Sequence, residues 1–328
     1  MRVLVTGGCG FIGSHFVKRL AAGGEDVVVF DKLTYSGNPA NLEGVPHRFV
    51  RGDIADQEAV AAAGEGCEAV VNFAAETHVD RSILEAGEFI RTDVVGTHVL
   101  LEWARGARAR FVQVSTDEVY GDVPAGHSSR EEDPLRPSSP YAASKAGGDL
   151  QVLAYVRTYG VDAAVTRGSN TYGPNQYPEK LIPLFVTNAL DGEPLPVYGD
   201  GRQVRDWLHV ADHCSAIEFV LRAGERGEVY NVAGGEEREN LDMTRRVLEL
   251  TGRDESLVRH VRDRPGHDRR YSLDAGKLRA LGWAPRRSVD EGLSETVEWY
   301  REHRAWWEPL KSGEYRTYYE RQYAERLG

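Results

Sequence analysis

Short apolar runs alternate with amphipathic stretches through the first half of the chain. The runs are rich in β-branched residues, as buried strands are, and lie at 2–6, 27–30, 47–52, 69–73, 111–115 and 161–166. Stretches with a helical pattern lie at 14–22, 81–106 and 139–159. Strands that alternate with helices pair in parallel, so we predict an α/β fold built on a doubly wound parallel sheet.

The pattern changes after residue 173, where prolines divide the chain into shorter pieces. The prolines are Pro174, Pro178, Pro183, Pro194 and Pro196. We predict that residues 1–173 form a first domain and residues 174–328 a smaller mixed α/β lobe. Strands are predicted near 204–209 and 228–232, where some are expected to return to the first sheet, and helices near 181–190, 242–251 and 289–303. The tail at 306–328 is rich in Trp, Tyr and Arg and is expected to pack or to form an interface.

A glycine-rich turn joins the first predicted strand to the first predicted helix. Gly7, Gly10 and Gly13 allow a tight turn, a close approach of backbone to a pyrophosphate, and packing of the helix on the sheet. The second strand ends in Asp31, 18 residues after Gly13, near the offset of the acid that binds an adenosine ribose. A carboxylate there repels a 2′-phosphate. The sequence therefore predicts a Rossmann-type site for NAD in preference to NADP.

Candidate catalytic groups follow the strand at 111–115. Thr116, Asp117 and Glu118 come at its carboxyl end, where open α/β sheets bind ligands. Tyr141 and Lys145 are four residues apart in a predicted helix and leave it on one face. An ammonium beside a phenol favours the phenolate, so we expect Lys145 to lower the pKa of Tyr141. Adjacent carboxyls can split their pKa values into an acid and a base, but the residues alone do not assign which is which.

Composition and charge narrow the class of protein. The 328 residues are 41% hydrophobic, which is enough for a substantial core, and the net charge of −11 disfavours binding to nucleic acid or an anionic membrane. Cys9, Cys67 and Cys214 are far apart and give neither a disulfide framework nor metal-ligand spacing. No apolar run approaches the roughly 18 residues of a membrane span. We expect a cytoplasmic protein with no metal, nucleic-acid partner or membrane partner.

The glycine turn, taken with Tyr141-x-x-x-Lys145, resembles the extended short-chain dehydrogenase/reductases that act on nucleotide sugars. Within that superfamily, the chain resembles the dTDP-glucose 4,6-dehydratase family over nearly its whole length. The segments that carry the resemblance are Ala74-Ala75-Glu76-Thr77-His78-Val79-Asp80-Arg81-Ser82, Ser115-Thr116-Asp117-Glu118-Val119-Tyr120-Gly121, Pro178-Glu179-Lys180-Leu181-Ile182-Pro183, Val204-Arg205-Asp206-Trp207 and Arg264-Pro265-Gly266-His267-Asp268. The Asp-Glu pair after Thr116 is the most discriminating, because related epimerases and decarboxylases lack it at that place.

The resemblance implies a reaction and a role for each candidate catalytic group. It implies a tightly bound NAD that is regenerated in each turnover, and conversion of dTDP-glucose to its 4-keto-6-deoxy product. Tyr141 would be the base at the C4 hydroxyl, with Lys145 lowering its pKa and holding the nicotinamide ribose. Glu118 would remove the C5 proton, Asp117 would protonate the departing C6 hydroxyl, and Thr116 would form a hydrogen bond near C4.

The resemblance also implies ligand contacts, position by position. On the cofactor side they are Gly7, Gly10, Phe11, Ile12, Gly13, Asp31, Lys32, Leu33, Thr34, Asp53, Ile54, Phe73, Ala74, Ala75, Thr92, Tyr141, Lys145 and Thr171. On the substrate side they are Thr77, Thr116, Asn170, Lys180, Leu181, Pro196, Val197, Tyr198, Arg205, Asn231, Arg264 and His267. Arg205 and His267 are expected at the diphosphate. This chain has Asp93 and Thr171 where the family usually has Asn.

A homodimer is a further expectation from the family, with the helices at 81–106 and 139–159 forming a four-helix interface. Two alternatives stay open at this point. A nucleotide-sugar 4-epimerase, or a dehydratase that acts on a UDP- or GDP-sugar, would share the fold, and would differ in whether the C6 hydroxyl is lost and which base is accepted. A non-catalytic NAD sensor would share the glycine turn but would not need the candidate acid and base.

Overall fold

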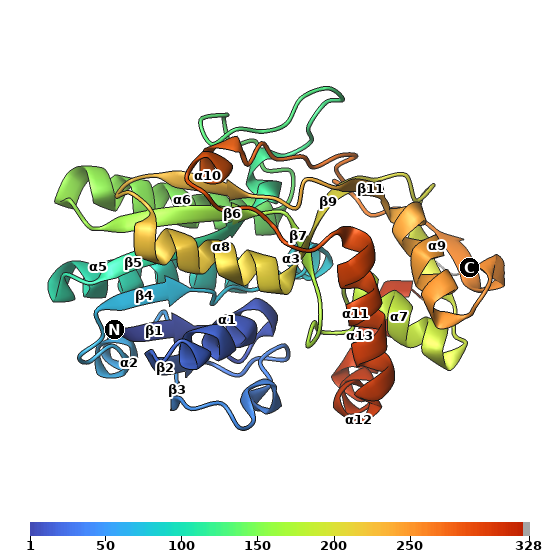
Figure 1. The fold of residues 1–328 in the computed structure, drawn as a ribbon, viewed down its shortest axis with the longest axis horizontal. Coiled ribbons are helices and arrows are strands. Elements are labelled where there is room, and N and C mark those ends of the chain that lie inside the picture. Colours follow the sequence, from blue (N-terminus) through green and yellow to red (C-terminus); the bar gives the residue numbers. More distant parts are fainter. Residues whose placement is uncertain (324–328) are drawn as a thin grey trace.

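The larger part of the molecule is a parallel sheet of seven strands (Figure 1). The computed structural model describes residues 1–323. The strand order is β10-β6-β5-β4-β1-β2-β3, and all neighbouring strands are parallel. The strands are β1 (Arg2–Thr6), β2 (Asp26–Asp31), β3 (Arg48–Arg51), β4 (Ala69–Asn72), β5 (Arg110–Thr116), β6 (Ala163–Gly168) and β10 (Val229–Val232). The predicted doubly wound sheet is confirmed, because the chain runs outward from β1 in both directions.

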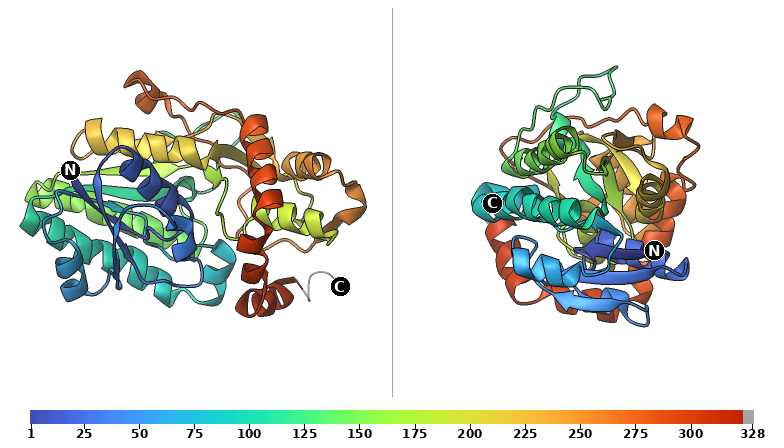
Figure 2. Two further views of the ribbon diagram at one scale, coloured as in Figure 1. Left: turned by 60° about the horizontal axis from the view of Figure 1, so that its bottom comes forward. Right: turned by 90° about the vertical axis from the view of Figure 1, so that its left-hand side faces the viewer.

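Helices cover both faces of this sheet (Figure 2). They are α1 (Phe11–Ala22), α2 (Gln57–Ala63), α5 (Thr97–Ala107), α6 (Pro140–Tyr159), α8 (Val210–Ala223) and the short α10 (Gly276–Ala280). On one face α1 and α8 pack together over a core that includes Phe16 and Ile217. On the other face α2, α5 and α6 cover a core that includes Phe30 and Phe111. Because both faces are buried, the strands read as continuous apolar runs.

A smaller lobe with its own core adjoins the carboxyl edge of the sheet (Figure 1). One small sheet has the order β11-β9-β7, and β8 pairs with β12 in a second. These strands are β7 (Asn170–Tyr172), β8 (Leu195–Tyr198), β9 (Val204–His209), β11 (Glu237–Glu239) and β12 (Val258–Val261). The helices are α7 (Leu181–Asp191), α9 (Asn240–Thr251), α11 (Val289–Glu302), α12 (Arg304–Trp307) and α13 (Glu314–Tyr323). Trp307 and Tyr323 are buried in this core, so the tail packs as far as residue 323; residues 324–328 lie outside the described chain.

The helical segment predicted at 81–106 is not one helix. The structure divides it into α3 (Val79–Leu84), α4 (Gly87–Ile90), a π-helical segment η2 (Arg91–Gly96) and α5. Glu85 ends α3 because its backbone is extended, with φ −151° and ψ 87°. The prediction for 139–159 is confirmed: Ser139 caps α6 through its side chain, Pro140 begins it, and Gly160 ends it in the left-handed region at φ 68°.

Within residues 1–323, no helix has the length and apolar character needed to cross a membrane. The same part of the chain has no cluster of three or more His, Cys, Asp or Glu side chains that could hold a metal ion. Cys9, Cys67 and Cys214 are buried free thiols.

Candidate active site

Two cavities lie side by side at the carboxyl edge of the main sheet. We call the first the sheet-edge cavity; it is lined by the β1–α1 turn, by the ends of β2, β4 and β5, and by Tyr141 and Lys145 of α6. We call the second the inter-lobe cavity; it is lined by Glu118, by α7, β8 and β9, and by the loop that holds Arg264 and His267. Glu179 and Lys180 line both cavities. A ligand in each cavity would therefore meet the other near Lys180.

The glycine turn leaves room for backbone only. Gly7 has φ +64°, and a Cβ atom there would lie 2.7 Å from the Ala74 nitrogen and 2.8 Å from the Phe73 carbonyl carbon. A Cβ atom on Gly13 would lie 2.2 Å from the Gly7 carbonyl oxygen. No side chain caps the first turn of α1, whose N-terminus therefore points free amides at the cavity. This is a good site for a pyrophosphate, because the amides and the helix dipole both favour an anion.

Asp31 ends β2 at the wall of the sheet-edge cavity. Its two carboxylate oxygens accept hydrogen bonds from the backbone N–H groups of Cys9, at 2.9 Å, and Leu33, at 2.8 Å. Burial raises the pKa of Asp31. Each oxygen retains a lone pair for a ribose hydroxyl, so the donor set and the glycine cradle both fit NAD.

Sixteen of the eighteen cofactor residues predicted from the sequence line the sheet-edge cavity. The other two, Leu33 and Thr171, do not line it. Leu33 packs against the core beneath the turn and holds Asp31 through its N–H group. The Thr171 hydroxyl instead bonds to the Ser169 carbonyl oxygen at 3.1 Å and to His213 Nδ1 at 2.7 Å. The Thr171 hydroxyl is thus engaged within the protein and does not line the cavity.

The end of β5 brings the candidate acid and base into the space between the cavities. Thr116 ends β5, and its hydroxyl accepts a hydrogen bond from the Glu118 backbone at 3.3 Å, which begins the 3-10 turn η3 (Asp117–Tyr120). Glu118 lines the inter-lobe cavity. Asp117 lies beneath it, 3% exposed, and burial together with the charge of Glu118 raises the pKa of Asp117 to about 8. Asp117 is therefore protonated at neutral pH, as a general acid must be.

Tyr141 does not have the lowered pKa expected from the sequence. Burial, reinforced by the charges of Glu118 and Asp93, raises its pKa well above the usual value, while the Thr116 hydroxyl acts in the opposite direction. Lys145 lies on the same side of α6 and donates a hydrogen bond to the Val114 carbonyl oxygen at 2.8 Å. The sequence places the Lys145 ammonium near Tyr141, but it does not show that the charges of Glu118 and Asp93, which come from other elements, act on the same phenol.

The inter-lobe cavity gathers cationic side chains. Lys180 is half-buried, and its partial desolvation lowers its pKa. Arg205 lies over the ring of Tyr271 at 4.1 Å and donates a hydrogen bond to the Asp268 carbonyl oxygen at 3.0 Å. Arg264 and His267 come from the loop after β12. Ammonium, guanidinium and imidazole groups can donate hydrogen bonds to the oxygens of a diphosphate.

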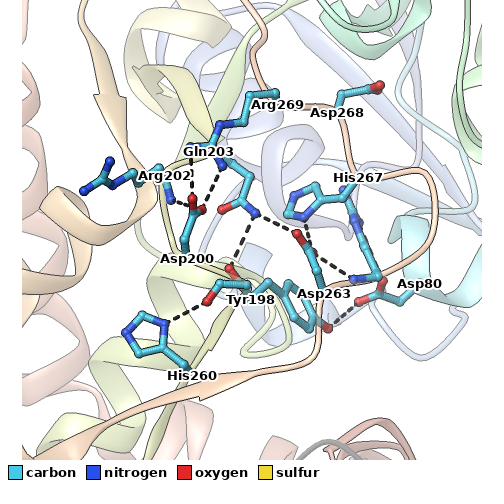
Figure 3. A network of polar contacts seen from close by, with 12 residues as sticks. Asp80, Tyr198, Asp200, Arg202, Gln203, His260, Asp263, His267, Asp268 and Arg269 are labelled. Carbon is cyan, nitrogen blue, oxygen red and sulfur yellow. Dashed lines mark hydrogen bonds and ion pairs between the residues drawn. The ribbon is translucent and has the colours of Figure 1, made fainter.

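Asp263 holds that loop in place (Figure 3). One carboxylate oxygen lies 2.6 Å from His267 Nδ1, and the other accepts a hydrogen bond from Gln203 at 2.9 Å. Burial lowers the pKa of His267 to about 4, an effect that Arg264 reinforces. His267 is thus neutral near pH 7, and its contribution at a diphosphate is a hydrogen bond and not a charge.

The remaining predicted substrate residues divide into two groups. Those that line the inter-lobe cavity are Asn170, Leu181, Pro196, Val197 and Tyr198. Thr77 lines the sheet-edge cavity instead, and Thr116 stands at the turn between the two.

Asn231, a member of the predicted substrate set, lies outside both cavities. It lies on β10 in the main sheet, fully buried, and lines neither cavity. Its amide accepts a hydrogen bond from Tyr120 at 2.8 Å and donates to the Ser129 and Asp274 carbonyl oxygens. These contacts use the side chain within the protein, so the structure gives Asn231 a role in packing.

Several cavity residues were not predicted from the sequence. On the sheet-edge side they include Gln176 and Tyr177, and on the inter-lobe side His78, Asp80, Asn240 and Tyr271. Asn240 is the clearest case, because its buried Oδ1 has no hydrogen-bond partner among residues 1–323. No spacing marks Asn240 as a ligand residue; only the packing of α9 against β11 brings it to the cavity.

Comparison with known proteins places the chain in a family. The family model described as GDP-mannose 4,6 dehydratase matches residues 4–296. The chain belongs to this family. A relative in the GDP-mannose 4,6 dehydratase family is the dTDP-glucose 4,6-dehydratase of Streptomyces niveus, 57% identical over 324 residues that cover 95% of this chain and 96% of that protein. The dTDP-glucose 4,6-dehydratase of an Actinoplanes species is 52% identical, over 94% of this chain and 100% of that protein.

Solved structures agree with this family membership. DesIV, the dTDP-glucose 4,6-dehydratase of Streptomyces venezuelae, crystallised with NAD, has a TM-score of 0.93 and 56% identity, covering 95% of this chain and all of that one. The UDP-glucose 4-epimerase of Thermus thermophilus, also with NAD, has a TM-score of 0.87 and 36% identity, over 92% of this chain and all of that one. Members with different reactions therefore share the fold, so the side chains between the cavities must decide the chemistry.

Proposed function

We propose that this protein is a dTDP-glucose 4,6-dehydratase with a resident NAD. The observation that carries the proposal is the pair of carboxyl groups at the end of β5, close to Tyr141, in which Asp117 is buried and Glu118 lines the inter-lobe cavity. A 4-epimerase needs a base at the C4 hydroxyl, whereas loss of water also needs a second base and an acid. Relatives of 57% and 52% identity with the same activity support the choice.

Bound NAD would supply the capacity to accept a hydride from C4 of the sugar and to return it to C6. Tyr141, between Thr116 and the carboxylates, would take the proton of the C4 hydroxyl. The ketone at C4 then acidifies the proton on C5, which Glu118 would remove. Asp117 would give its proton to the C6 hydroxyl, which leaves as water. In the last step Glu118 would return its proton to C5 as the hydride reaches C6. Protons then balance over the cycle, because the proton that Tyr141 took from the C4 hydroxyl replaces, by way of solvent, the one that Asp117 gave to the departing water.

The two cavities would hold the ligands in the order this chemistry needs. The glycine turn and Asp31 would bind the adenosine and pyrophosphate of NAD, and Lys145 would lie near its nicotinamide ribose. Arg205, Arg264 and His267 would bind the diphosphate of the substrate. Glu118 and Tyr141 would then lie on either side of the glucose ring, at the meeting point of the cavities.

Substrate selection tests the proposal. Purified protein, without added NAD, is incubated separately with dTDP-, UDP- and GDP-glucose, and the products are weighed by mass spectrometry. We expect the dTDP sugar to lose one water and the other two to react slowly. An unchanged mass that conceals a galactose epimer would favour the epimerase.

We also propose that the protein is a homodimer and cytoplasmic. Large exposed apolar side chains gather on α3, α4, η2 and α6: Ile83, Leu84, Ile90, Val95, Leu150 and Tyr159. On α6 the exposed side chains Ala143, Leu150 and Ala154 repeat at the spacing of a helix packing stripe. A second copy of these helices would cover this surface. Three buried free cysteines are in keeping with a reducing compartment.

A further inference from the structure

Asp93 is a buried carboxyl at the back of the helix that carries Tyr141 and Lys145. It lies in η2, is 1% exposed, and accepts a hydrogen bond from the Ser144 hydroxyl at 2.6 Å. Its other oxygen is buried and has no hydrogen-bond partner in the described part of the chain. An Asn at this position would be neutral and could accept the same hydrogen bond from Ser144. The chain therefore buries an ionisable carboxyl, which costs free energy of folding, where a neutral amide could make the same hydrogen bond.

The backbone is built so that this carboxyl can reach α6. The π-helical turn of η2 directs two successive residues inward, with Thr92 lining the sheet-edge cavity and Asp93 facing Ser144. Gly148 lets the elements approach, because a Cβ atom there would lie 2.8 Å from the Asp93 carbonyl oxygen. Gly147 acts likewise, since its Cβ atom would lie 2.9 Å from Val94.

Charged groups from several elements face this region. Lys145 of α6 lowers the pKa of Asp93, whereas burial, the largest effect, and the carboxylate of Glu76 raise it, to about 6. Tyr141 is in turn subject to Glu118 and Asp117 of the β5 end, and to Asp93 of η2, all of which raise its pKa. Asp93 thus acts on both the cation and the phenol of the catalytic helix.

We propose that Asp93 is a positioning residue that fixes the catalytic helix through Ser144 and offsets part of the positive charge that Lys145 presents to Tyr141. The proposal rests on the proposed function, in which Tyr141 must lose its proton before C4 is oxidised. A negative charge at position 93 disfavours the phenolate. The chain then oxidises its substrate at a higher pH than its Asp93→Asn variant would.

Two variants separate the charge of Asp93 from its hydrogen bond. In Asp93→Asn the amide oxygen can still accept from Ser144, so only the charge is removed. In Ser144→Ala the hydrogen bond is removed and the charge stays. Appearance of reduced nicotinamide on mixing holoenzyme with dTDP-glucose reports the oxidation of C4, and is measured as a function of pH in each variant.

We expect Asp93→Asn to move the midpoint of this pH profile downward by about one unit, at the low end of shifts caused by a neighbouring charge. We expect Ser144→Ala to slow the step by about tenfold, the factor that one hydrogen bond of ordinary strength represents, with the midpoint unmoved. An unmoved midpoint in Asp93→Asn, or an equal movement in Ser144→Ala, would overturn the proposal.

A second measurement does not depend on the reaction. Tyrosinate absorbance of the NAD-bound protein is titrated, with the matching Tyr141→Phe protein subtracted in each background. Tyr141 should ionise at lower pH in Asp93→Asn than in the wild type, and an equal or higher pH would overturn the proposal. Absence of any product from wild-type protein would instead count against the proposed function alone.

Thermal unfolding as a function of pH measures the cost of the buried acid. Between about pH 4 and pH 6 Asp93 ionises in the unfolded state but stays protonated in the folded state, because burial raises its pKa to about 6. The stability of Asp93→Asn relative to wild type should therefore rise over this range.

Discussion

Asp117 and Glu118 are consecutive residues whose carboxyl groups lie in different surroundings. Asp117 is enclosed by protein, with one oxygen accepting a hydrogen bond from Thr116 at 3.2 Å, and Glu118 faces the inter-lobe cavity. A single turn therefore carries a buried acid of raised pKa next to a carboxyl group that faces a cavity. This difference would allow Asp117 to give a proton while Glu118 takes one.

Replacement of Glu118 by Gln should stop the reaction after its first step. Tyr141 is still able to remove the C4 hydroxyl proton, but no base takes the proton from C5. Reduced nicotinamide should therefore accumulate to one equivalent per protein, and formation of dehydrated product should fall by about 10²- to 10⁴-fold, the usual contribution of a general base. Absorbance in the nicotinamide band and product mass measure both effects. Normal turnover would show that Glu118 is not the C5 base.

The pH profile of turnover should have a descending limb set by Asp117. Because its pKa is raised to about 8, Asp117 is protonated below that pH and loses the proton that C6 needs above it. We expect kcat to fall as pH rises through about 8, approaching a tenfold loss per pH unit. Asp117→Asn should be slow at every pH and should lack this limb. A limb retained in Asp117→Asn would assign it to another group.

Arg205→Lys should weaken binding of the nucleotide sugar more than it slows the chemistry. Lysine keeps the charge but loses the planar group that lies over Tyr271 and donates to the Asp268 carbonyl oxygen. We expect KM to rise by about tenfold, consistent with the loss of one charge-assisted hydrogen bond, and kcat to change less. Arg269→Lys, on an exposed ion pair with Asp200, is the matched control and should leave KM unchanged. Equal effects of the two substitutions would contradict a substrate contact for Arg205.

Asn231 and Asn240 should differ in what their replacement damages. Asn231→Ala removes the partner of Tyr120 and of two carbonyl groups, so it should lower the free energy of unfolding by about 2 kcal/mol. The KM of the folded fraction should be unaffected. Asn240→Ala should instead raise KM with a smaller loss of stability. Denaturant unfolding and initial rates measure both, and a raised KM in Asn231→Ala would restore it to the substrate set.

Leu150→Arg should convert the proposed dimer to a monomer. The Leu150 side chain is 58% exposed on α6, which packs against η2, where Val95 is also exposed. A charge buried there without a partner would prevent association. Sedimentation at micromolar concentration should show a dimer for the wild type and a monomer for Leu150→Arg, with Arg157→Ala at the end of α6 as the control. A wild-type monomer would contradict the interface.

The strands and the glycine turn could be predicted because they depend on local pattern. Apolar runs such as Val27 to Phe30 and the spacing of Gly7, Gly10 and Gly13 have few other interpretations. The break at Glu85 was not predicted, because neither Glu85 nor its immediate neighbours Leu84 and Ala86 disfavour a helix, and the contacts of α3 and α4 with α6 depend on the tertiary fold. The candidate catalytic groups at the end of β5 could also be predicted from local pattern, because they directly follow an apolar strand.

Neither the raised pKa of Tyr141 nor the different surroundings of Asn231 and Asn240 could be predicted from the neighbouring residues in the sequence. Asn231 lies within β10 and Asn240 begins α9, and only tertiary contacts decide that the first is enclosed by Tyr120 and Ser129 while the second reaches a cavity. Likewise, Asp93 is distant in sequence from Tyr141, and the close approach of η2 to α6 brings its charge to the phenol.

The path of one hydrogen atom tests the central claim most directly. Purified protein is incubated with dTDP-glucose that carries deuterium on C4, and the product is analysed by mass spectrometry and NMR. The account predicts a product lighter by one water that holds the deuterium on C6, because the same bound cofactor takes and returns it. Recovery of undehydrated sugar with the label still on C4, or of dehydrated product without deuterium on C6, would contradict the account.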